Sequence, residues 1–326
     1  MIDDITAIPG VRERSVRFRS GGETLVGVLS LPATGTPCGG RPSADGRKGD
    51  ERGDGAGGGD ARKVSPESPS RGVVIVHGWG SYRAGPHDIL VKLARELASR
   101  GLAAIRFDLR GRGESTGAVT ETDIDAMIDD TVAAASVLKD EVGVDAVDAT
   151  GLCSGANVAL AAAAHEGAFD RVAAFSAFPY QSHKSAMQGL RRTGGMFRKV
   201  FAKALNPVTW WRLVTGRVRV FRVLRTLFGG EGGKVKDASG ETRNLKDSTR
   251  DIMGSLAKYK GKLLFVWGSA DSEGMGAKAH FEEFARAHDL DARFEVIEGS
   301  NHNYYSLQWE REAIDMVAEF LGGDPA

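Results

Sequence analysis

The sequence predicts an α/β protein with a mostly parallel, eight-stranded sheet flanked by helices. Two observations predict this class. Short apolar runs alternate with segments of helical periodicity along most of the 326 residues. The runs are continuously apolar instead of alternating with polar residues, which is typical of parallel strands covered on both faces.

The first two predicted strands form a hairpin within residues 13–32. The runs "RSVRF" and "LVGVLSLP" are separated by Gly21 and Gly22. Glycine pairs between two such runs favour a tight turn, because glycine accepts positive φ angles.

A regular alternation of strand and helix begins near residue 72. The remaining predicted strands lie at residues 72–79, 102–111, 146–155, 171–180, 262–271 and 292–299. The predicted helices lie at residues 87–101, 122–143, 157–167, 277–288 and 306–321. The first of these helices has apolar residues at helical spacing and ends at Gly101, a residue typical of a helix C-terminus.

Two segments interrupt the alternation. Residues 39–60 contain nine glycines and nine charged residues among 22, so we expect a flexible surface insertion over about 33–70. The second interruption follows the sixth strand, and we expect a basic, mainly helical cap over 179–255. The stretch from 171 to 230 holds 12 Lys and Arg residues and no Asp or Glu. The predicted core therefore comprises residues 1–178 and 256–326.

Composition excludes several classes of protein. The formal net charge is zero, and only two cysteines, Cys38 and Cys153, are present, so we expect no disulfide framework. Free thiols, the lack of an apolar segment near the start and the short apolar runs favour a soluble cytoplasmic protein. We find neither zinc-site spacing nor a phosphate loop, and we expect no metal, no cofactor and no nucleic-acid partner.

The segment "GLCSGA" (151–156) lies where a predicted strand turns into a helix. A nucleophile on such a turn needs small residues two positions to either side. Cys153 is flanked in this way by Gly151 and Gly155, whereas Ser154 would have Leu152 and Ala156. Cys153 is therefore the predicted nucleophile, although a buried structural cysteine is the alternative.

The other parts of a catalytic site follow in order along the chain. Asp271 ends one predicted strand, and His302 lies in the loop after the next. Loops at the carboxyl ends of parallel strands meet at one edge of a sheet, so the three side chains can form a triad. The N–H groups of Trp79 and Ser154 are the expected oxyanion donors. The residues expected to line the pocket are His77, Gly78, Gly80 and His87.

Five segments together resemble the α/β-hydrolase family: "VIVHGWG", "FDLRGRGES", "GLCSGA", "GSAD" and "GSNH". The third departs from the family pattern by placing cysteine where serine is usual. The resemblance implies the α/β-hydrolase fold, with the cap inserted after strand 6. A Cys-Asp-His triad resembles the dienelactone hydrolases, and a cap at this place resembles the capped serine-aminopeptidase-like hydrolases. A weaker resemblance is to hydrolases of exosortase and exopolysaccharide systems.

These features predict a hydrolase that cleaves an ester or thioester through an acyl-cysteine intermediate. Two alternatives remain open: an acyltransferase that uses the same acyl-enzyme, and a non-catalytic hydrolase fold that binds a partner or a membrane. For the basic cap, a solvated face, capture of an anionic or lipid-like acyl substrate, and peripheral membrane contact are all compatible with the sequence.

Overall fold

The computed structural model describes residues 10–33, 69–179, 234–236, 242–244 and 248–323. The chain divides into two compact units, residues 1–179 with 249–326, and residues 180–248. In the second unit, β7 (Lys234–Lys236) and β8 (Thr242–Asn244) form an antiparallel pair. Cys38, residues 34–68 of the expected insertion and most of the expected cap lie outside the described residues.

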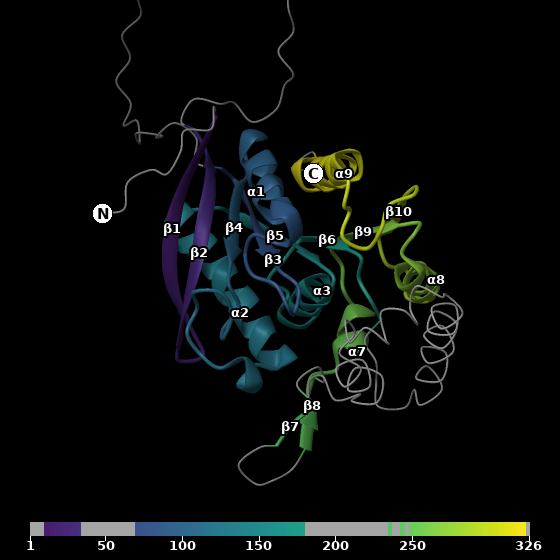
Figure 1. Ribbon diagram of the computed structural model, residues 1–326, viewed down its shortest axis with the longest axis horizontal. Coiled ribbons are helices and arrows are strands. Elements are labelled where there is room, and N and C mark those ends of the chain that lie inside the picture. Colours follow the sequence, from purple (N-terminus) through teal and green to yellow (C-terminus); the bar gives the residue numbers. More distant parts are fainter. Residues whose placement is uncertain (1–9, 34–68, 180–233, 237–241, 245–247, 324–326) are drawn as a thin grey trace, which may run out of the picture. The chain divides into compact units, whose positions relative to one another are not determined.

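An eight-stranded sheet organises the larger unit, in the order β1-β2-β4-β3-β5-β6-β9-β10 (Figure 1). Strands β1 and β2 are antiparallel to each other and β2 is antiparallel to β4, whereas the other neighbouring pairs are parallel. The strand bounds are β1 Val11–Ser20, β2 Glu23–Pro32, β3 Arg71–Val76, β4 Ala103–Phe107, β5 Ala146–Leu152, β6 Arg171–Phe175, β9 Lys262–Gly268 and β10 Ala292–Ile297. The predicted class and strand number are confirmed.

Helices cover both faces of this sheet. Helices α1 and α9 contact each other, and α3 contacts both α2 and α7 on the opposite face (Figure 1). The helix bounds are α1 Ile89–Ser99, α2 Ile124–Val137, α3 Ser154–Glu166, α7 Ile252–Leu256, α8 Ser272–Ala287 and α9 Leu307–Gly322. Short turns of other helix types are η1 Pro86–Asp88, η2 Val119–Glu121 and η3 Leu138–Val142.

Several predicted elements end at different residues in the structure. The predicted helix 122–143 is α2 followed by a π-helical turn, and its N-cap is Asp123, which accepts a hydrogen bond from the N–H of Ala126. The predicted strand 171–180 stops at Phe175, because Ser176 takes a φ of 49° and turns the chain. Strand β5 stops at Leu152 for the same reason, since Cys153 has a φ of 60°.

Apolar strand residues and the inner faces of α1 and α9 form the core on one face of the sheet. The four apolar residues of α1 that recur at helical spacing are buried: Ile89, Leu90, Leu93 and Leu97. They pack with strand residues such as Ile75 and Val266. The sheet fixes where its carboxyl-end loops begin, and the candidate site residues lie in these loops or at the ends of the elements that they join, such as Gly151 at the end of β5 and Ser154 at the start of α3.

Candidate active site

Cys153 occupies a sharp turn between β5 and α3. Its backbone angles, φ 60° and ψ −122°, are unusual for a residue other than glycine. The turn is held by hydrogen bonds of the Cys153 N–H to the carbonyl of Phe175 (2.8 Å) and of the Ala156 N–H to the carbonyl of Cys153 (3.0 Å). The residue is partly exposed. Strained backbone of this kind is concentrated at functional sites.

The two glycines around Cys153 have no room for a side chain. A Cβ atom on Gly151 would lie 2.4 Å from the carbonyl oxygen of Gly155, and one on Gly155 would lie 2.3 Å from that of Val76. Both contacts are with backbone atoms, which cannot move aside cheaply. Only glycine at both positions allows the start of α3 to pack this closely against β3 and β5.

His302 and Asp271 are held together by the two loops that follow β10 and β9. The Nδ1 atom of His302 lies 2.6 Å from Oδ2 of Asp271, whose side chain is 8% exposed. The loops are joined by hydrogen bonds from the N–H of Ala270 to the carbonyl of Ser300 and from the N–H of Gly299 to Oγ of Ser269. The structure thus brings Asp271 and His302 into direct contact.

His302 also acts on Cys153, and each of the two groups shifts the pKa of the other. The hydrogen bonds with Asp271 and Cys153 raise the pKa of His302 from 6.5 to about 10. Burial acts to raise the pKa of the Cys153 thiol, but the hydrogen bond and charge of His302, together with hydrogen bonds from Ser154, outweigh it and lower the pKa. A thiolate beside an imidazolium is therefore favoured, which is the reactive form of a cysteine.

Residues not identified from the sequence hold His302 in place. Phe178 stacks on its ring, with centroids 5.4 Å apart. The side-chain amide of Asn157 donates to the Phe178 carbonyl (2.7 Å) and accepts from the Phe178 N–H (3.0 Å). The hydroxyl of Ser176 donates to the His302 carbonyl (3.1 Å) and lies 3.2 Å from the hydroxyl of the buried Tyr304. No local motif marks these residues, because the strand order alone brings them to His302.

The loop after β3 contains the expected oxyanion donor. The backbone N–H of Trp79 donates to Oγ of Ser154 at 2.6 Å, so this loop is joined directly to the first turn of α3. Gly78 lies beside the turn, where a Cβ atom would be 3.8 Å from Cβ of Cys153. A Cβ atom on Gly80 would meet no atom within 4 Å, so Gly80 borders open space.

His77 lies in the interior instead of on a pocket wall, since it is only 1% exposed. Its Nε2 accepts a hydrogen bond from the N–H of Leu109 (3.1 Å), so its Nδ1 carries the proton and donates to the carbonyl of Gly78 (2.8 Å). Burial lowers its pKa from 6.5 to about 4. His77 is thus a neutral link between the loops that follow β3 and β4.

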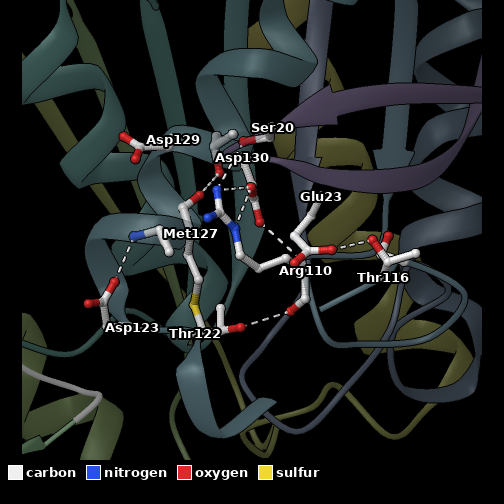
Figure 2. Close-up of polar contacts among 12 residues, drawn as sticks. Ser20, Glu23, Arg110, Thr116, Thr122, Asp123, Met127, Asp129 and Asp130 are labelled. Atoms are coloured by element: carbon white, nitrogen blue, oxygen red, sulfur yellow. Dashed lines mark hydrogen bonds and ion pairs between the residues drawn. The ribbon is translucent and has the colours of Figure 1, made fainter. Parts of the chain in front are cut away.

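The loop after β4 corresponds to the segment "FDLRGRGES". The buried Asp108 accepts hydrogen bonds from the N–H groups of Arg83 (2.7 Å) and Glu114 (3.0 Å). Arg110 extends to the buried Asp130 of α2, with Nε and Nη2 at 2.9 and 2.6 Å from Oδ1, and its Nη2 also lies 3.0 Å from Oγ of Ser20 (Figure 2). These residues shape the loop that carries Arg112, whose guanidinium lies 4.8 Å from the ring centroid of Trp79.

His87 is joined to the His302 loop from the other side. Its Nδ1 contacts the carboxylate of Glu310, a buried residue of α9. Its Nε2 lies 2.7 Å from the carbonyl oxygen of Asn303, one residue beyond His302. Lys92 also donates to Glu310, at 2.7 and 2.9 Å. The His87 ring therefore supports the loop, although the sequence suggested that it lines the pocket.

The described part of the chain contains neither a metal-binding cluster nor a membrane-spanning helix. Its His, Cys, Asp and Glu residues form no group of three that could hold a metal ion. None of its helices is long and apolar enough to cross a lipid bilayer.

Comparisons with known proteins identify the family and the fold of the chain. A model described as "Alpha/beta hydrolase family" matches residues 73–318. The search of curated proteins finds no match.

Solved structures similar to this chain include three enzymes. Esterase PF2001 of Pyrococcus furiosus has a TM-score of 0.57 and 18% identity, covering 95% of this chain and 90% of its own. Est1E of Butyrivibrio proteoclasticus, solved with ferulic acid, has a TM-score of 0.55 and 15% identity. The match covers 94% of this chain and 96% of that chain. Dienelactone hydrolase of Anabaena variabilis has a TM-score of 0.54 and 15% identity. The match covers 95% of this chain and 96% of that chain. At such identities the likeness shows the fold.

Proposed function

The chain belongs to the α/β-hydrolase family, and we propose that it hydrolyses an ester or thioester with Cys153 as its nucleophile. One observation carries the proposal: Cys153 occupies the strained turn at the end of β5, and its thiol has its pKa lowered by an imidazole that Asp271 orients. A nucleophile, a base and an orienting carboxylate in this relationship are the parts required for acyl transfer.

In the first step the Cys153 thiolate attacks the carbonyl carbon of the substrate and a C–S bond forms. The carbonyl oxygen becomes an oxyanion, for which the N–H groups of Trp79 and Ser154 are the proposed donors. When the intermediate collapses, the bond to the leaving group breaks, and the imidazolium of His302 gives its proton to the departing alcohol or thiol. The acyl group is then held as a thioester on Cys153.

In the second step His302 takes a proton from water, whose oxygen attacks the acyl carbon. The C–S bond breaks, the carboxylic acid leaves and the thiolate is regenerated beside the protonated His302. Asp271 keeps the Nδ1 of His302 protonated, so that Nε2 faces the sulfur and the reacting groups. The aromatic ring of Phe178 stacks on the imidazole, and we assign this ring to contact with the acyl group.

The names of the similar structures support an ester as the first substrate class to assay, since two are esterases and one is a dienelactone hydrolase. The basic composition of residues 171–230 supports including anionic acyl groups in the same panel. Both choices concern the substrate, and the assignment of the nucleophile does not depend on them.

Intact-mass analysis after mixing with activated esters and thioesters tests the proposal. The chain has two cysteines, so Cys38→Ala is a matched control for Cys153→Ala. We expect an acyl adduct and turnover in the wild type and in Cys38→Ala, and neither in Cys153→Ala with an unchanged melting temperature. Turnover that persists in Cys153→Ala would contradict the proposal. Added alcohols or amines that give acylated products would instead indicate acyl transfer.

A further inference from the structure

A hydroxyl group lies next to the sulfur, on the residue that follows it. Ser154 is the first residue of α3, and its Oγ accepts the Trp79 N–H at 2.6 Å. A Cβ atom on Gly78 would lie 3.7 Å from this oxygen and 3.8 Å from Cβ of Cys153. The hydroxyl and the carbon that bears the sulfur therefore border the same small volume beside the loop after β3.

The hydrogen-bonding capacity of a hydroxyl determines what Ser154 can do there. A serine hydroxyl has one hydrogen to donate and two lone pairs to accept with. The Trp79 N–H uses one lone pair, and an N–H group cannot accept a bond in return, so the hydroxyl hydrogen remains available. The Ser154 side chain acts to lower the pKa of the adjacent Cys153 thiol, as a hydroxyl that donates to a thiolate does. A hydroxyl that donates to the sulfur while it accepts from the backbone N–H of Trp79 would connect the two groups.

This arrangement has a second consequence for the proposed reaction. An oxyanion held by the Trp79 N–H has to approach within hydrogen-bond distance of that nitrogen. In the free protein this position is taken by the Ser154 oxygen. An incoming carbonyl oxygen and the Ser154 hydroxyl therefore compete for the same donor.

We propose that Ser154 is a catalytic residue whose hydroxyl donates to the Cys153 thiolate in the free enzyme and leaves the Trp79 N–H when the substrate oxygen binds. The inference rests on the proposed function. It explains why a hydroxyl at this position is useful although Ser154 does not occupy the nucleophile position of the turn. A side chain without a hydroxyl would leave the thiolate with one hydrogen bond fewer.

The loops around the turn carry other charged and titratable groups, of which His302 acts on the pKa of the Cys153 thiol. The loop after β10 contributes the His302 imidazolium, with Asp271 of the loop after β9 behind it. The loop after β4 contributes Arg112, which lies over the Trp79 ring. The loop after β3 contributes the buried His77, whose lowered pKa keeps it neutral. None of these groups changes when Ser154 is replaced, so a change in the thiol pKa reports on the hydroxyl.

The test is the pH dependence of alkylation of Cys153 by iodoacetamide in a Cys38→Ala background. This reaction needs no turnover. Ser154→Ala should move the titration of the thiol upward by about one pH unit, because hydrogen bonds to charged groups are among the stronger ones. Ser154→Thr, which keeps the hydroxyl, should restore most of the shift. Ser81→Ala, on the same loop as Trp79, should leave the titration unchanged.

An unchanged titration in Ser154→Ala, in a protein that still forms the acyl adduct on Cys153, would overturn the inference and leave the proposed function intact. A shift in Ser154→Ala that Ser154→Thr does not restore would also overturn it. A shift that Ser154→Thr restores, together with turnover that survives in Cys153→Ala, would instead remove the proposed function while the hydrogen bond to the thiolate stands.

Discussion

The Nδ1 atom of His302 lies 2.6 Å from Oδ2 of Asp271, and the two residues come from loops that follow different strands. The contact holds the Nδ1 side of the ring against the carboxylate and leaves Nε2 for Cys153. It also raises the pKa of His302 to about 10, with the hydrogen bond to Asp271 as the largest cause. One pair of atoms thereby determines the orientation and the charge of the imidazole.

Asp271→Asn should lower kcat by about 10³- to 10⁴-fold, because the amide stabilises the wrong tautomer of His302. The measurement is the steady-state hydrolysis of an activated ester near neutral pH. Glu298→Gln is the control, since this exposed residue lies in the same region without touching His302. A fall of less than tenfold in Asp271→Asn would contradict the assigned role of the carboxylate.

Gly151→Ala should destabilise the protein by more than about 3 kcal/mol, because the new methyl group meets backbone atoms that cannot move without breaking the turn. Gly276→Ala in α8 is the control. A Cβ atom there meets no atom within 4 Å, and alanine is the better helix former by about 1 kcal/mol. Urea unfolding of both variants checks the prediction, which fails if Gly151→Ala has the stability of the wild type.

Asp130→Asn should lower the free energy of unfolding by about 3 kcal/mol, since it leaves the half-buried Arg110 guanidinium without its charged partner. Asp129→Asn is the matched control one residue earlier in α2. Asp129 is half exposed and pairs with Arg250, so its loss should cost under about 1 kcal/mol. Figure 2 shows the two carboxylates at different places around α2. Equal effects in chemical denaturation would contradict this difference.

His77 should make the protein less stable in acid. Burial lowers its pKa from 6.5 to about 4, so between these values the unfolded chain binds a proton that the folded protein does not. The free energy of unfolding therefore falls as the pH falls through this window, by a total of about 3 kcal/mol from this residue. His77→Gln should remove that part of the pH dependence in urea titrations at pH 7 and pH 4. The control is His280→Gln, at an exposed position, which should keep the full pH dependence of the free energy of unfolding.

His87→Ala should lower kcat by about tenfold and change KM little. The variant loses the contact between Nε2 and the Asn303 carbonyl, which supports the loop of His302, and small displacements of catalytic groups reduce rates strongly. His288→Ala, at an exposed position, serves as the control. A change confined to KM would indicate instead that His87 contacts the substrate.

Much of the fold could be predicted because its signals are local. Continuous apolar runs such as that of β3 and the periodic apolar residues of α1 are visible in the chain itself. The small residues around Cys153 report a tight turn in the same way. Residues without such a signal were missed: nothing near Asn157 or Ser176 in the sequence indicates that they support Phe178 and His302.

For some residues the predicted location was correct, but the structure gives them a different role. His77 and His87 lie near the site, as predicted, but both rings are used in hydrogen bonds between loops. Ser154 was expected to contribute only its N–H, whereas its hydroxyl contacts the Trp79 N–H. These differences concern side-chain partners, which depend on how loops from separate strands meet.

The sequence by itself determined the alternation of strands and helices, the turn at Cys153 and the order of the three candidate triad residues, because these follow from local periodicity and from the small size of glycine. Only the tertiary structure decided that Asp271 touches His302, that Phe178 stacks on it and that Ser154 accepts from Trp79. Such contacts join residues between 31 and 124 positions apart. Their distances are set by the order and register of strands in the sheet, which no local pattern encodes.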